Sequence, residues 1–421
     1  MELTSSMARK KLLNPTFASL WLIMFLVEFV KGALIVSILP VYMGDVLKLS
    51  AFAIGLSFSM QYIGDNLFRS PAGWLIERIG FRRTMSLGLF ITLGAVAMIA
   101  FLPSMGFLVL GCALLGIGTA PLWPCVLMGI TAVTEENNNF ATAMGVIQIS
   151  SLGGTGLGPV LINFFLNDSY QPIFWFLLGC LMLVLLVSLM LPGKKGGSTA
   201  AGSSKAAVPA HSPSAKIGGM WRQLRASIHH IRTQLDVSPL LYPALFLQSF
   251  AVGLLTPVIT LYVRTELGLS PETFSAMLVI GGGITVLGLI PVGKLVDRLG
   301  TRWFLHIGFA LAALSIGLFA MTREVALVWS FVILIGCSYA LILPTWNTMI
   351  AQMIPSGEKG TIWGLFLTIQ GSGMVVGPII SGKMWDLLGP AAPFLTSAVT
   401  MALLFFLHLG LVRTQKASPT P

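Results

Sequence analysis

Long runs of apolar residues, interrupted by short polar stretches, dominate the pattern along the chain. Twelve of these runs are long enough to cross a bilayer, since a spanning helix needs about 20 mainly apolar residues. None shows the full polar face of a helix at a soluble protein's surface. The pattern predicts an all-α membrane protein with twelve transmembrane helices. We expect them at 17–42, 51–76, 84–103, 105–131, 139–166, 171–192, 239–264, 271–296, 303–321, 325–353, 361–385 and 391–412.

Three polar or small-residue markers occur twice along the chain at a nearly constant spacing. The motif Gly-x-Leu-x-acid-Arg-x-Gly-x-Arg begins at Gly73 and again at Gly293, 220 positions later. Gly-x-x-x-Gly-Pro also occurs twice inside apolar runs, and Trp123 is matched by Trp346. This duplication predicts two pseudo-symmetric six-helix halves, 1–192 and 239–421, with a binding site between them, as in secondary transporters.

The segment between the halves, 193–238, has a different composition. Residues 193–215 are rich in Gly, Ser, Ala and Pro, which is typical of a flexible linker. In 216–236, apolar residues recur at helical spacing while Arg and His occupy the other side. We expect this part to form an amphipathic helix on the cytoplasmic membrane surface.

Composition and charge support a membrane protein and indicate its orientation. Hydrophobic residues make up 55% of the chain and charged residues only 10%, against about 25% charged residues in soluble domains. Placing both termini in the cytoplasm puts 19 of the 25 Lys and Arg residues on that side, as the positive-inside rule requires. The net charge of +10 therefore reports orientation and predicts no nucleic-acid partner. We expect a monomeric, multi-pass protein of a bacterial cell membrane.

Signals for an enzyme, a cofactor or a metal are missing from the sequence. The four cysteines all fall inside apolar runs and form no disulfide or metal-ligand pattern. The phosphate-loop signature Gly-x-x-x-x-Gly-Lys-Ser/Thr is absent, so we do not expect ATP to drive transport. An ion gradient is the remaining energy source.

Four charged residues lie inside predicted spans and away from the span ends. Glu28 and Lys31 are three apart in the first run, and Asp65 and Arg69 are four apart in the second, so each pair shares a helix face. Each charge costs about 2.5–3.5 kcal/mol at the bilayer centre on insertion scales, which marks such residues as functional. We expect Glu28 and Asp65 to bind protons. The alternative is two structural ion pairs.

The second half carries no charge near the middle of its predicted spans. A cavity between the halves would then be charged on one wall and apolar on the other, and an amphiphile would use both walls. We expect its head group on the first half and its tails on the second. The candidate substrate and proton site comprises Glu28, Lys31, Asp65, Arg69, Trp123, Trp346, Asn347 and Gln370.

The duplicated motifs have two predicted roles. The loop motif is interpreted as a charge latch that is broken and remade as the halves rock, and the alternative is a topological anchor. Its residues are Gly73, Glu77, Arg78, Gly80, Arg82 and Arg83, and in the second half Gly293, Asp297, Arg298, Gly300 and Arg302. The small-residue motif should allow close helix packing, through Gly154, Gly158, Pro159, Gly373, Gly377 and Pro378.

The loop motifs, the twelve spans and the long central linker resemble the major facilitator superfamily over essentially the whole chain. Within it, LVEFVKG, YIGD, PLW, LPTWNT and IQGSGMVVGP are similar to the bacterial flippases of the lipoteichoic-acid anchor glycolipid. This resemblance implies that Glu28, Asp65 and Trp123 form the sugar and proton site, with Lys31 where the family has Arg. Ser151 aligns with a second pocket Trp of that family. Lys in place of Arg removes the planar fork that suits bidentate contacts.

Three functional hypotheses follow. The first is a proton-coupled transporter of an amphiphile, in its sharpest version a glycolipid flippase. The second is a multidrug efflux antiporter of the same superfamily. The third is a sensor or assembly subunit that transports nothing, which dispensable buried charges would favour.

Overall fold

The computed structural model describes residues 15–134, 140–165, 170–191, 239–352 and 359–417. All regular structure in these ranges is helical. The predicted amphipathic helix at 216–236 lies outside the described residues. Nine helical stretches of the described part are long and apolar enough to cross a membrane by length and composition, which agrees with the predicted all-α membrane fold.

The first half begins with a long rod that combines α-helix and π-helix. It consists of α2 (Pro15–Gly32), η1 (Ala33–Ile38), α3 (Leu39–Val41) and η2 (Tyr42–Val46). The helices that follow are α4 (Ala51–Ile79), α5 (Phe81–Phe101), α6 (Met105–Thr119), α7 (Leu122–Thr134), α8 (Phe140–Phe165) and α9 (Gln171–Met190).

The second half repeats this order. Its first rod combines α11 (Leu241–Leu255), α12 (Ile259–Leu261) and the π-helical η3 (Tyr262–Glu266). The remaining helices are α13 (Pro271–Leu299), α14 (Arg302–Met321), α15 (Val325–Gln352), α16 (Lys359–Leu388) and α17 (Ala392–Ala417). Eleven of the twelve predicted spans correspond to one helix or rod each, and the span predicted at 105–131 corresponds to α6 and α7 together. Each half holds its own buried hydrophobic core.

The turn after the first rod is repeated down to its hydrogen bonds. The Leu47 N–H donates to the Tyr42 carbonyl at 3.0 Å, and the Leu267 N–H donates to the Tyr262 carbonyl at 3.1 Å. Ser50 and Ser270 then cap the next helix of their half with their hydroxyls. Because α4 and α13 are both 29 residues long, positions 220 apart in these two helices are equivalent.

The first rods of the two halves differ by one residue. A Cβ on Gly154 of α8 would clash with the Phe25 carbonyl, and a Cβ on Gly373 of α16 would clash with the Phe246 carbonyl. These matched packing positions are 221 apart, whereas Tyr42 and Tyr262 are 220 apart. The first rod therefore holds one extra residue, and its π-helix η1 accommodates it, as single-residue insertions in helices commonly do.

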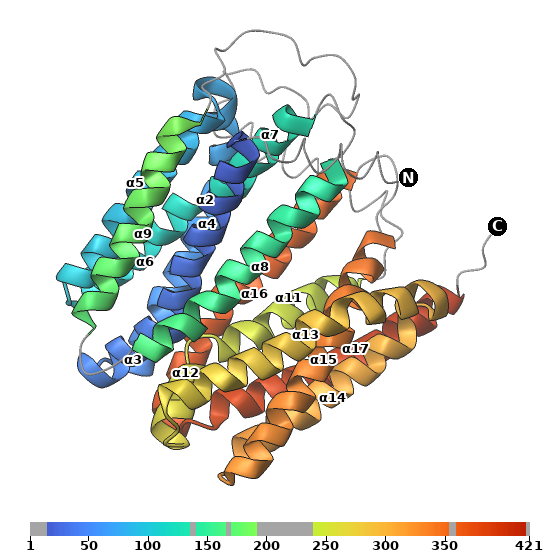
Figure 1. Cartoon of the computed structure of the whole chain (residues 1–421). Helices are drawn as coiled ribbons and strands as arrows, with labels where there is room; N and C mark the ends of the chain where they lie inside the picture. Colours follow the sequence, from blue (N-terminus) through green and yellow to red (C-terminus); the bar gives the residue numbers. More distant parts are fainter. Residues whose placement is uncertain (1–14, 135–139, 166–169, 192–238, 353–358, 418–421) are drawn as a thin grey trace, which may run out of the picture.

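The two halves lean together at one end, which we call the closed end (residues 36–59, 259–275 and 375–386). There the Ser59 hydroxyl donates to the Val375 carbonyl at 2.6 Å and the Ser275 hydroxyl to the Val160 carbonyl at 3.2 Å. Figure 1 shows the bundles touching around α3 and α12 and diverging from there. The C-terminal parts of α4 and α13 (67–80 and 287–300) lie at the opposite, open end.

Candidate functional site

Helices α2 and α4 bring the four predicted intramembrane charges together. Arg69 and Asp65 form a salt bridge along α4, with 2.9 Å between Nη2 and Oδ2. Lys31 of α2 lies close enough to interact electrostatically with Glu28, Asp65 and Arg69. The two sequence pairs therefore form one cluster of two carboxylates and two cations, which we call the charged cluster.

Glu28 finds its hydrogen-bond partner on another helix. Its Oε2 accepts a hydrogen bond from the Thr155 hydroxyl of α8, at 3.1 Å. Thr155 lies between Gly154 and Gly158, where α8 packs directly on α2. Sequence reasoning missed Thr155, although its place inside the Gly-x-x-x-Gly motif predicted that it would face another helix closely.

The other predicted substrate residues lie at different depths. Trp123 is half-buried against the core of the first half. Trp346 is only 3% exposed and packs edge-on against Phe309, inside the core of the second half. Asn347 is exposed and Gln370 half-buried. The structure therefore brings the four charges together but places Trp346 within its own half.

Helix α16 passes α4 beside the charged cluster. A Cβ on Gly371 would lie 2.7 Å from Oδ1 of Asn66, the neighbour of Asp65. Tyr62, one turn earlier on α4, lies close enough to Thr256 of the second half for their side chains to interact. The cluster therefore lies where the two halves face each other.

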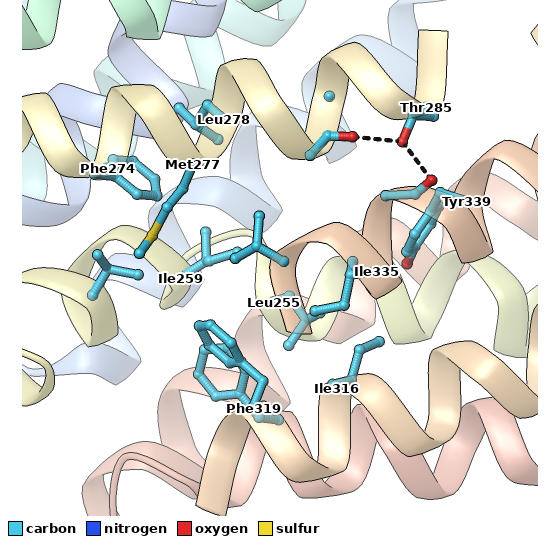
Figure 2. A pocket seen from close by; sticks show the side chains of 16 residues that line it. Leu255, Ile259, Phe274, Met277, Leu278, Thr285, Ile316, Phe319, Ile335 and Tyr339 are labelled. Carbon is cyan, nitrogen blue, oxygen red and sulfur yellow. Dashed lines mark hydrogen bonds between the residues drawn. The ribbon is translucent and has the colours of Figure 1, made fainter. Parts of the chain in front are cut away.

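The second half contains an apolar pocket of about 250 Å³ (Figure 2). Helices α11 to α15 and α17 contribute its walls, with Leu255, Met277, Phe319 and Ile335 among the side chains that Figure 2 shows pointing inward. Its polar groups are few. The Thr285 hydroxyl lies 3.0 Å from the carbonyls of both Gly281 and Gly336, so its single proton is already engaged.

A run of glycines opens this pocket. Gly281 and Gly282 of α13 line it, and their equivalents in α4 are Gln61 and Tyr62. Gly116 packs on the Gln61 backbone as Gly336 packs on the Gly281 backbone, which fixes the equivalence. A Cβ on Gly282 would meet no atom within 4 Å. Sequence reasoning missed this pocket. The 220-residue spacing could have indicated it, because it pairs Gly281 and Gly282 with the larger residues Gln61 and Tyr62 of the first half.

Within the pocket, Thr285 occupies the position equivalent to Asp65. The same helix position is thus a salt-bridged carboxylate in the first half and a neutral hydroxyl in the second. Charge and apolar volume are separated between two walls of one repeated architecture.

The loop motifs lie at the open end. Gly80 and Gly300 follow α4 and α13 with φ of 86° and 81°, a conformation that favours glycine. The Arg78 guanidinium lies 4.1 Å from the Trp74 ring centre, and Arg82 donates to the Leu189 carbonyl.

Two charged residues of the second loop motif point into solvent, whereas Arg302 is half-buried. Asp297 and Arg298 are exposed, and neither belongs to a salt bridge among the described residues. Arg302 lies near the Trp303 ring. Gly73 and Gly293 have no neighbour within 4 Å of an added Cβ. The rest of the predicted latch comprises Arg83, which is exposed, and Glu77, whose side chain lies outside the described set.

The described residues contain no group of three or more His, Cys, Asp or Glu side chains that could hold a metal ion. Two buried histidines, His306 and His408, pack with ring centres 4.6 Å apart. Two side chains alone make no metal site, so the charged cluster and the apolar pocket remain the candidate functional groups.

Comparison with known proteins gives a family and several relatives. The model of the Major Facilitator Superfamily matches residues 20–230 and 241–421. A protein of Staphylococcus saprophyticus, described as the proton-coupled antiporter flippase LtaA, is 26% identical over 381 residues, covering 89% of this chain and 88% of its own. Its Staphylococcus aureus counterpart is 25% identical over 373 residues, covering 88% and 87%.

Solved structures share the fold at low sequence identity. A mutant form of the nucleoside transporter NupG superposes with a TM-score of 0.77 at 15% identity, covering 94% of this chain and 99% of its own. The human organic anion transporter MFSD10 gives a TM-score of 0.61 at 17% identity, with the same coverage. At this identity the structural likeness shows the fold alone.

Proposed function

The chain belongs to the major facilitator superfamily of secondary transporters, and on this premise we propose that it moves a lipid-like amphiphile, in the sharpest version a membrane glycolipid, in exchange for protons. The observation that carries the proposal is the contrast between the charged cluster of α2 and α4 and the apolar pocket behind α13. A sugar or an inorganic ion would leave the apolar pocket unused, whereas a lipid engages both.

The apolar pocket supports a tail-binding role. The Thr285 proton is already shared between two carbonyls, and the other side-chain hydroxyl of the pocket is that of Tyr339. A strongly polar guest would therefore lose its hydration for little compensation, which is unfavourable. An alkyl chain loses nothing polar and gains about 0.8 kcal/mol for each buried methylene. We therefore place one acyl tail, or part of one, between Gly282 and Phe319.

The charged cluster supports binding of a sugar head group. Its carboxylates accept hydrogen bonds from sugar hydroxyls, and its Lys and Arg nitrogens donate to sugar oxygens. The exposed Asn347 and the half-buried Gln370 offer amides from the second half. A head group held between α4 and α16 would contact both halves, which a substrate must do if its binding is to change when they move.

Proton coupling is assigned to Asp65 and Glu28. The cluster holds two carboxylates and two cations, so it is neutral when all four are ionised. Adding one proton to Asp65 would leave Arg69 without its 2.9 Å partner and give the cluster a positive charge. Head-group contacts and protonation then compete for the same oxygens, which provides a physical route to exchange.

Alternating access is assigned to rocking of the halves about the charged cluster. With the predicted orientation, the closed end faces the outside and the open end faces the cytoplasm. This state would admit the substrate from the cytoplasmic side. The exposed loop-motif residues Asp297 and Arg298 would then form their latch contacts only when the open end closes.

The test uses purified full-length protein in liposomes with a fluorescent diglucosyl lipid. A reductant that cannot cross the membrane bleaches only the outer leaflet, so the bleached fraction reports flipping. We expect an imposed proton gradient to accelerate flipping of the glycolipid but not of a phosphatidylcholine with the same labelled tail. Equal flipping rates with and without the gradient would refute the proposal, and so would a flipping rate in protein-containing liposomes no higher than in empty ones.

The second candidate is efflux of hydrophobic drugs, and the shape of the apolar pocket favours it. A drug cation could contact the carboxylates while its rings enter the pocket, without any sugar. Competition separates the two functions. A glycolipid substrate predicts inhibition by the water-soluble head-group sugar and no gradient-driven release of a lipophilic dye cation, and a drug substrate predicts the reverse.

A further inference from the structure

The first turn of α4 is capped by a side chain from the opposite half. Asp386, near the end of α16, accepts hydrogen bonds from the backbone N–H groups of Ala51 at 3.0 Å and Phe52 at 2.9 Å. The first N–H groups of a helix have no partner within it, and a carboxylate there also interacts favourably with the helix dipole. Two of these donors therefore depend on a residue 335 positions away.

The equivalent first turn of α13 needs no help from the other half. Pro271 takes the place of Ala51 and has no N–H to satisfy, which is why proline suits this position. Glu272 takes the place of Phe52, and its carboxylate lies close enough to its own backbone N–H and to the Ser270 hydroxyl to interact with both. In this pair of helices, only the first turn of α4 is completed across the interface.

The neighbouring contacts at the closed end differ from this cap. Ser59, Thr260 and Ser275 donate hydroxyls to carbonyls of the opposite half. A Ser or Thr hydroxyl can turn back to a carbonyl of its own helix, so separation leaves it satisfied. The two backbone N–H groups of α4 have no such option and must exchange Asp386 for water when this end opens.

We infer that Asp386 is the gating residue that holds the closed end shut, acting through the first turn of α4. The biological role of such a gate rests on the proposed transport function, but the experiment that tests the gate does not require transport. Opening of this end requires the Asp386 carboxylate to leave two N–H groups at once. The carboxylate is exposed, so it releases and rebinds in contact with water, as a reversible gate must.

The experiment measures the conformational equilibrium without any substrate. In a variant lacking native cysteines, spin labels on Ile79 and Leu299, the last residues of α4 and α13, report the width of the open end. Separately, Ser275→Cys reports the closed end, because Ser275 is 0% exposed and reacts with an impermeant thiol reagent only when that end opens. Both are measured in nanodiscs at one fixed pH.

We expect Asp386→Ala and Asp386→Asn to shorten the Ile79–Leu299 distance distribution and to raise the Ser275→Cys reaction rate about fivefold, the lower range of typical coupling effects. Ala51→Pro should act in the same direction but less, because it removes one of the two donors and proline is tolerated there. Glu272→Ala is the matched control, a first-turn carboxylate that does not cross the interface, and should change neither readout.

Three results would overturn the inference. The first is unchanged distances and reaction rates in both Asp386 variants. The second is an equal shift in Glu272→Ala, which would show that any first-turn carboxylate suffices. The third is loss of folded protein in both Asp386 variants, since a gate is not required for either half to fold. If the protein did not transport glycolipids, the distance and reaction-rate measurements would still test the gate, because they use no substrate.

Discussion

Helices α4 and α13 have the same length, the same serine cap and the same loop motif, yet they form chemically opposite walls. In α4, Asp65 pairs with Arg69 beside Lys31. In α13, Thr285 lies in an apolar pocket opened by Gly281 and Gly282. The comparison teaches that the repeated architecture comes from caps, turns and small residues. Function comes from a few positions that are free to differ.

The largest effect is expected from removing the charge that separates the walls. Asp65→Asn keeps the size and hydrogen bonding of the side chain but cannot exchange a proton. Gradient-driven flux in proteoliposomes should fall to the level of empty liposomes, while head-group binding, measured by thermal shift, is retained. Glu28→Gln should lower flux about tenfold, as expected for loss of one charged hydrogen bond.

The alternative, in which the buried charges are structural ion pairs, predicts a different result for Asp65→Asn. If the charges are a structural ion pair, the variants should express poorly and what folds should transport normally. Wild-type flux per folded molecule in both single variants and in the double variant would end the coupling assignment. Measuring folded protein by gel filtration beside each flux separates these cases.

Adding a charge to the apolar wall should also abolish the difference between the two walls. Thr285→Asp places a carboxylate among apolar side chains with no cation nearby in the pocket, and an unpaired buried charge costs about 3–5 kcal/mol. We expect a lower thermal midpoint and loss of flipping for long-tailed lipids. Thr285→Val, which removes the hydroxyl only, should keep most of the transport, and equal losses in both would contradict the two-wall model.

Filling the pocket should have a smaller and more selective effect. Gly282→Phe would occupy volume that the structure leaves open, so we expect about a tenfold loss for long-tailed lipids, from displacing one or two buried methylenes. Gly283→Phe is the matched control, because Gly283 also has open space around it but does not line the pocket. Identical effects of the two variants on tail-length preference would refute tail binding here.

The loop motif provides a test of motion rather than of chemistry. If Asp297 contributes to a latch that forms as the open end closes, Asp297→Asn should slow turnover about fivefold and leave substrate affinity within about twofold. The measurement is flux against substrate concentration. Normal turnover would reduce the motif to a topological anchor.

The smallest effect concerns the turn that both halves share. Lys48 has φ of 53° where the equivalent Gly268 has 63°, and a non-glycine residue pays about 1 kcal/mol there. Lys48→Gly should therefore raise the thermal midpoint slightly without changing flux. A lowered midpoint would show that the Lys48 side chain makes a stabilising contact.

Much of the fold could be predicted from the sequence, because it depends on local signals. Apolar runs of membrane length give the helices, and the positive-φ glycines Gly80 and Gly300 end two of them. The 220-residue spacing gives the halves. Spacing along the helices also places Glu28 with Lys31 and Asp65 with Arg69, whereas the meeting of these two pairs depends on how α2 and α4 are placed in the bundle.

The details of the site depended on contacts between distant segments. Trp346 matches Trp123 in sequence, but its ring packs on Phe309 within its own half, because rotation about the helix axis decides which face it joins. Thr155 reaches Glu28 only because α8 approaches α2 through glycines. Asp386 bonds to α4 from a position 335 residues later in the sequence. Such tertiary partners leave no periodic signal.

The single extra residue absorbed by η1 has a consequence for how the first half acquired its charged face. One residue added to an α-helix would turn everything before it by about 100°, but the wider π-helical turn of η1 absorbs that rotation. The Phe25 carbonyl therefore still faces Gly154 as the Phe246 carbonyl faces Gly373, and Glu28 and Ser249 occupy equivalent places beside these glycines. The charges of the first half thus come from the side chains at these places and not from a rotated helix. Deleting one residue within Ala33–Ile38 should convert η1 to α-helix and leave Glu28 and Lys31 directed as they are now.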